Sequence, residues 1–99
     1  MIDKDGYPTE ETLGRIRAFN PLKDDPFDFV EYLCENWVNG YPPDWNKAGD
    51  LQLSTGGWSG CESIIAALKE TPFPSFWSLY WYQSRVGGHY WFKVRRIGK

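Results

Sequence analysis

The amino-acid sequence predicts a single α+β domain over residues 1–99, with the element order α-α-β-α-β-β and a small antiparallel sheet. Apolar residues recur at helical spacing along much of the chain, whereas aromatic and β-branched residues dominate its last quarter. The length of 99 residues suits one hydrophobic core. We therefore expect helices on one face of a sheet that ends in a long aromatic hairpin.

The first helix is predicted over residues 9–19. Leu13, Ile16 and Phe19 fall on one helical face, and acidic residues occupy the first turn, where the helix dipole favours them. Pro21 then ends the helix, because the residue before a proline avoids the helical conformation.

The second helix is predicted over residues 26–39. Asp25 suits the N-cap, and Pro26 suits the first helical position because its backbone angle is already helical. A continuous apolar stripe extends to Trp37, and Gly40 suits the position after the helix end.

A short strand, a glycine turn and a third helix are predicted to follow one another. Apolar and polar residues alternate over residues 51–54, which is typical of a half-buried strand. Gly56 and Gly57 allow a tight turn after it. Ser59 and Glu62 fit a capping box at the start of the third helix. We predict that these four residues shape the loop.

The last quarter is predicted to form a hairpin of residues 76–85 and 89–96 around a glycine turn. Side chains alternate across a strand, so Trp77, Leu79 and Trp81 share one face, which we expect to pack on the helices. The opposite face mixes hydroxyl, aromatic and basic side chains, and we expect it to meet solvent or a partner.

Five residues are predicted to contact a partner. Large aromatic side chains and arginine are enriched in protein interfaces. Trp58, in the glycine turn, is either a plug folded onto the core or an exposed anchor. The other four lie on the mixed face of the hairpin: Tyr80, Tyr82, Trp91 and Arg95.

The charge is divided along the chain. The formal net charge of −2 combines −6 for residues 1–50 with +4 for residues 51–99, so either half could steer a partner electrostatically. Without a long apolar run or a basic, apolar leader, we expect no membrane association and a cytoplasmic location. Cys34, Cys61 and His89 are too few for a structural zinc site, so no metal or cofactor is predicted.

Two other functions use the same residues. The aromatic and basic hairpin face resembles a stacking platform for single-stranded nucleic acid, although the chain is acidic overall. A small hydrolase or ligand-binding protein could instead use the glycine turn, as an anion cradle or with Cys61 as nucleophile and His89 as base. Cys61 also falls on an apolar stripe, which favours a packed, unreactive thiol.

The second half of the chain resembles a family of short proteins from tailed bacteriophages and prophages. The residues that carry this resemblance are Leu-Ser-Thr-Gly-Gly-Trp-Ser-Gly-Cys-Glu at 53–62, then Phe76-Trp77, Tyr80-Trp81, Gly87-Gly88-His89-Tyr90 and Phe92. Cys61 departs from the asparagine usual in that family.

The resemblance implies a viral accessory protein with no established enzymatic activity. The size and charge of this chain are similar to those of anti-CRISPR and other anti-defence inhibitors. We therefore predict a non-enzymatic phage protein that binds and inhibits a host protein in the host cytoplasm, with a CRISPR-Cas effector subunit as the leading candidate.

Overall fold

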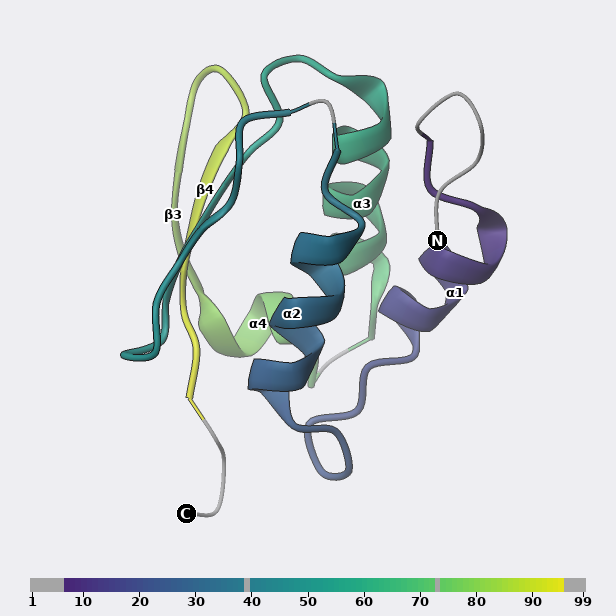
Figure 1. Cartoon of the computed structure of the whole chain (residues 1–99). Helices are drawn as coiled ribbons and strands as arrows, with labels where there is room; N and C mark the ends of the chain where they lie inside the picture. The colour runs from purple at the N-terminus through teal and green to yellow at the C-terminus, as the bar shows by residue number, and fades with distance from the viewer. Residues whose placement is uncertain (1–6, 39, 73, 96–99) are drawn as a thin grey trace.

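The computed structural model describes residues 7–38, 40–72 and 74–95, which form an α+β fold. Its four-stranded antiparallel sheet has the order β1-β2-β4-β3, and the helices lie on one side of it (Figure 1). The elements are α1 (Glu10–Arg17), α2 (Pro26–Glu35), β1 (Asp44–Trp45), β2 (Asp50–Ser54), α3 (Ser59–Glu70), α4 (Phe76–Tyr80), β3 (Trp81–Arg85) and β4 (His89–Lys93).

The hydrophobic core lies between the sheet and the layer of α2 and α3. Leu51, Leu53 and Phe92 point into it from β2 and β4, and each is at most 2% exposed. The buried side of α3 meets them with Ile64 and Leu68. Burial of these apolar side chains between the sheet and the helices supplies the main stabilisation of the fold.

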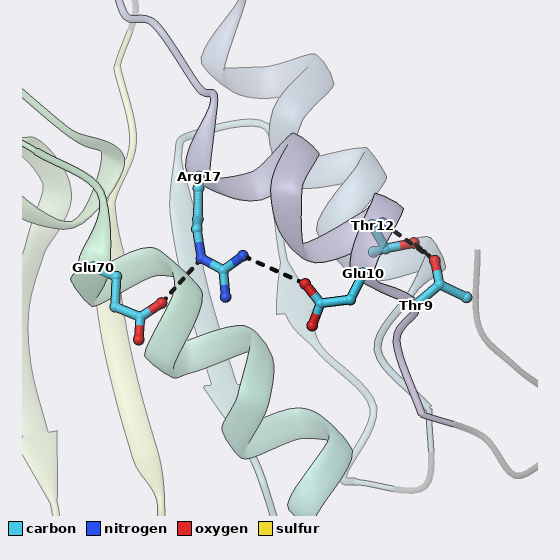
Figure 2. Close-up of polar contacts among 5 residues, drawn as sticks. All are labelled: Thr9, Glu10, Thr12, Arg17 and Glu70. Atoms are coloured by element: carbon cyan, nitrogen blue, oxygen red, sulfur yellow. Dashed lines mark hydrogen bonds and ion pairs between the residues drawn. The ribbon is translucent and has the colours of Figure 1, made fainter.

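Helix α1 packs on α3 from the side away from the sheet. Arg17 reaches across to Glu70, with 2.9 Å between Nε and Oε1, and lies 4.0 Å from Glu10 on its own helix (Figure 2). Thr9 caps the helix, because its hydroxyl accepts a hydrogen bond from the backbone N–H of Thr12. Exposed ion pairs contribute little, so α1 is held mainly by its buried apolar face.

Both predicted N-terminal helices form, but they end earlier than the sequence suggested. Helix α1 ends at Arg17 and α2 ends at Glu35, whereas the predicted ends were residues 19 and 39. Residue 39 lies outside the described residues. Asp25 caps α2 as predicted, since its side chain accepts from the N–H of Phe27 at 2.9 Å.

The prediction of a strand over residues 76–80 is wrong, because these residues form α4. Ser75 and Ser78 form a capping box in which each side chain accepts from the other's backbone N–H. Phe76 is 1% exposed and contacts the rings of Phe19 and Phe92. The cap and the buried Phe76 outweigh the β propensity of the aromatic residues, and the strand begins only at Trp81.

The predicted capping box of Ser59 and Glu62 does not form. The N-cap of α3 is Trp58, which makes no side-chain cap bond, and Ser59 is already the first helical residue. Gly56 and Gly57 do shape the preceding turn as expected, with φ of +60° and +80°. Helix α3 therefore begins at Ser59, one residue earlier than it would begin if Ser59 were its N-cap.

The hairpin turn is tied to the end of β2. Gly88 has φ of +79°, and a side chain there would collide with the Thr55 hydroxyl. Its carbonyl accepts from the N–H of Thr55 at 2.9 Å. This close approach brings the end of β2 beside the start of β4, where Ser54 pairs with His89.

Candidate binding face

One face of the sheet is left uncovered by the described helices, and we call it the outer face (Figure 1). Leu51 and Leu53 of β2 point into the core, so the intervening residues of β2 point outward. Strand pairing places β4 and β3 residues beside them on the same face. The outer face comprises Asp44, Asp50, Gln52, Ser54, Tyr82, Gln83, Arg85, His89, Trp91 and Lys93.

The aromatic part of the outer face lies on β3 and β4. Tyr82 is 56% exposed, and with half-buried Trp91 it lines a shallow depression of about 130 Å³. The guanidinium carbon of Arg85 lies 5.6 Å from the centroid of the Trp91 ring. A cation over an indole face is attracted to it, which helps to orient both side chains.

An irregularity in β3 creates this arrangement. Trp81 pairs with Phe92 and Gln83 pairs with Trp91, so Tyr82 is an extra residue without a partner in the register. An extra residue of this kind re-aims side chains and increases the local twist. Side chains therefore do not alternate regularly between the two faces after Trp81, and Tyr82 lies beside Trp91.

The acidic and basic halves of the chain meet at Asp50 and Lys93. The Lys93 ammonium lies 2.7 Å from Asp50 Oδ1 and joins β2 to β4 across the outer face. Hydrogen bonds from Lys93 and then from Asn46 hold the pKa of the Asp50 carboxyl below its ordinary value. This carboxylate is therefore already satisfied within the chain.

A cleft of about 280 Å³ lies at the β1 end of the outer face. It is lined by Tyr41, Pro42, Asp44, Gln52, Ser54 and His89. The Ser54 hydroxyl lies 2.8 Å from Nδ1 of His89 and accepts from the Gln52 amide at 3.3 Å. Asp44 and Gln52 also line the depression beside Trp91, so the two hollows adjoin.

A serine hydrogen-bonded to a histidine can act as a nucleophile with its base. Here Ser54 is only 6% exposed, which leaves little room for a substrate carbonyl to reach its oxygen. We interpret the bond as one that holds the His89 ring in place. Sequence reasoning missed this pair, because residues 35 positions apart meet only through the β2–β4 register.

Tyr82, Trp91 and Arg95 remain available for contact, because Tyr82 and Trp91 lie on the outer face and Arg95 is exposed after β4. The placement of Tyr80 on that face is wrong. Tyr80 is 5% exposed, and its hydroxyl donates to the Arg95 carbonyl at 2.7 Å. As the last residue of α4 it follows the helical rather than the strand pattern.

Trp58 lies away from the outer face, at the start of α3. It is half-buried and packed against the core, and its ring centroid is 5.0 Å from that of Tyr7. This position agrees with a tryptophan that folds onto the core rather than with an exposed contact residue.

Cys61 and His89 have separate hydrogen-bond partners. The Cys61 thiol donates to the Val38 carbonyl at 3.2 Å, and burial raises its pKa to about 11. A thiol with this pKa is almost entirely protonated at neutral pH and is a poor nucleophile. The geometry therefore gives no support to a cysteine hydrolase.

The described residues contain no group of three or more His, Cys, Asp and Glu side chains placed to hold a metal ion. Across the same residues, no helix has the length and apolar character needed to cross a bilayer. Comparisons of the chain with protein-family models, curated proteins and solved structures find no match. The resemblance to phage proteins therefore stays a prediction.

Proposed function

We propose that this chain is a non-enzymatic binding protein that contacts a partner protein through the outer face of its sheet. The observation that carries the proposal is that exposed Tyr82 and half-buried Trp91 line one depression of the outer face, with Arg85 over the Trp91 ring. Tyrosine, tryptophan and arginine are the residues that most often dominate the energy of protein interfaces.

The distribution of exposed apolar side chains supports the same face. Of the six large apolar side chains exposed among the described residues, Tyr82 lies on the outer face and Tyr41 lines the cleft at the β1 end of that face. Single exposed apolar residues are common on proteins, whereas two exposed tyrosines beside adjoining hollows of one uncovered face favour a contact surface.

We further propose that the partner is a host component of a bacterial defence system, with a CRISPR-Cas effector subunit as the leading candidate. The resemblance to phage proteins supports a viral source. The small size and acidic net charge of −2 support the inhibitor role by analogy.

The test is expression of the tagged protein in bacteria with an active CRISPR-Cas system, beside a strain that lacks the effector genes. We expect a targeted phage to regain plating only in the first strain, and an effector subunit to co-purify in near-stoichiometric amount. Unchanged plating together with no co-purified effector subunit would contradict the defence role.

Binding of single-stranded nucleic acid is the second candidate, favoured by Arg85 over Trp91. Two observations weigh against it: Lys93 is occupied by Asp50, and Asp44 adds a negative charge to the same face. A labelled oligonucleotide whose binding weakens steeply with salt would favour this candidate, because phosphate contacts release counterions. Capture of a single protein whose binding does not change with salt would exclude nucleic-acid binding as the main function.

A further inference from the structure

The cleft beside β1 carries one formal negative charge, which no basic side chain of the described residues pairs with. Asp44 is exposed and is the only acidic residue among the six that line the cleft. Of the basic side chains within residues 7–38, 40–72 and 74–95, none forms an ion pair with it. Asp50 nearby differs, because Lys93 already occupies its carboxylate.

The other walls of the cleft suit a flat, polar group. Tyr41 is 60% exposed and offers an aromatic ring, and Pro42 adds an apolar wall. The His89 ring is held by Ser54, which in turn is held by Gln52. One N–H of the Gln52 amide is used in this way, and the carbonyl oxygen of the same amide is an acceptor for a ligand.

A carboxylate, an amide acceptor and an exposed ring together match the guanidinium group of arginine. Its planar fork of N–H groups bonds a carboxylate in a bidentate manner, and its faces stack on aromatic rings. A lysine ammonium makes the charge contact but has no flat face for the ring. The cleft therefore favours arginine over lysine.

We propose that this cleft receives an arginine side chain of the partner protein, with its guanidinium on the Asp44 carboxylate and against the Tyr41 ring. This inference rests on the proposed function and specifies the partner's chemistry. The cleft adjoins the Trp91 depression through Asp44 and Gln52, so a partner lying on the outer face can reach both hollows at once. Asp44 lines both hollows, so its carboxylate favours a basic group of the partner at this point of the outer face.

The experiment is an NMR titration of the isotope-labelled full chain with the acetylated, amidated tripeptide Gly-Arg-Gly. The matched probes replace arginine with citrulline, which has the same shape without the charge, or with lysine. We expect the arginine peptide to produce saturable shifts in the Gln52 side-chain amide and in the Ser54 backbone amide. The citrulline peptide should leave both signals in place, and lysine should bind more weakly than arginine.

Variants decide whether the shifts come from this cleft. We expect Asp44→Asn to weaken binding of the arginine peptide by about tenfold or more, the loss that follows from removing one charge-assisted contact. Tyr41→Ala should remove the preference for arginine over lysine. Asp28→Asn is the matched control, because Asp28 is an exposed acid of α2 outside this cleft, and it should leave binding unchanged.

Equal shifts with the arginine and citrulline peptides, equal affinity for lysine, or unchanged binding in Asp44→Asn would each overturn the inference. The titration uses no host partner. Its failure would therefore overturn the arginine cleft alone, whereas failure of the plating and co-purification experiment would overturn the proposed function.

Discussion

At the scale of single residues, the thiol of Cys61 is held in its neutral form. Burial raises its pKa to about 11, and the same cause, followed by the charges of Glu31 and Glu35, raises the pKa of Cys34 to about 11. At pH 8 about one such thiol in a thousand is ionised, compared with about one in four for an ordinary thiol. Both cysteines are therefore expected to be unreactive in the folded protein.

We predict that both cysteines of the folded protein react with iodoacetamide at pH 8 about 100-fold more slowly than in the urea-unfolded chain, because only the thiolate attacks. Mass spectrometry of each cysteine peptide over time measures the two rates. Modification of Cys61 at equal rates in the folded and unfolded protein would contradict the assigned environment.

The pH dependence of stability has a definite sign for these thiols. The folded state holds the thiol protons more tightly than the unfolded state. The thiols' contribution to the free energy of unfolding is therefore complete below the unfolded pKa of about 8.5. It is lost as the pH rises toward 11, the folded value for Cys61. Cysteine titration should therefore lower the free energy of unfolding in alkaline solution, and Cys61→Ser should reduce that loss.

Tyr80 shows the limit of prediction at this scale. Its spacing from Tyr82 agrees with a shared strand face, but that argument holds only if both residues are in the strand. Tyr80 ends α4 and is buried, whereas Tyr82 lies in β3 and is exposed. A local change of secondary structure therefore moves one residue of the pair from the surface into the core.

At the scale of elements, two serines separate a real helix cap from an apparent one. The Ser75 hydroxyl accepts from the N–H of Ser78 at 3.1 Å, and Ser75 is 3% exposed. Ser59 is exposed and stands inside α3 without a capping bond.

We predict that Ser75→Ala lowers the free energy of unfolding by about 1–2 kcal/mol, the usual cost of losing an N-cap. Ser59→Ala should change it by less than about 0.5 kcal/mol, as expected for an exposed residue without such a bond. Urea unfolding of the two variants beside the natural protein measures both values. Equal losses would show that Ser59 caps α3 after all.

Two glycines with the same backbone conformation allow a second paired comparison. Gly57 and Gly88 have φ of +80° and +79°, so an alanine meets similar backbone strain at both positions. Around Gly57 there is open space, whereas a side chain at Gly88 would collide with Thr55.

We predict that Gly57→Ala costs about 1–2 kcal/mol through backbone strain, and that Gly88→Ala costs about 1–3 kcal/mol more because of overpacking. Thermal unfolding with matched buffers measures the difference between the two variants. If both lose the same stability, the hairpin turn does not approach the end of β2 as closely as described.

Most elements of this fold follow from local sequence signals. The starts of α1 and α2, the strand β2, the glycine turn and the β4 alternation all have such signals, and each forms within one residue of its predicted position. Strand β4 ends at Lys93, earlier than the predicted end at residue 96, which lies outside the described residues. The signals failed at residues 76–80, where aromatic residues suit a strand locally but Phe76 fills the core between α2 and β4. The helical conformation of residues 76–80 depends on contacts with residues distant in the sequence, so it cannot be predicted from their neighbours.

At the scale of the whole molecule, the binding face depends on which side of the sheet the helices cover. The sequence predicted a mixed face on β4, and Trp91 and Lys93 do lie on the outer face. It did not predict the cleft, because the cleft joins Tyr41 and Asp44 to His89 through the pairing of β1, β2 and β4. Register between distant strands is set by the complete fold.

The most direct test of the account compares the outer face with an exposed apolar residue elsewhere, through affinity for the co-purified host protein. We predict that Tyr82→Ala combined with Trp91→Ala raises Kd by about 100-fold or more, as expected when two dominant contacts are lost. Leu22→Ala should leave Kd unchanged, because Leu22 is 82% exposed but lies before α2, away from the sheet. A double variant that keeps its circular dichroism spectrum and still binds as tightly as the natural protein would contradict the central claim.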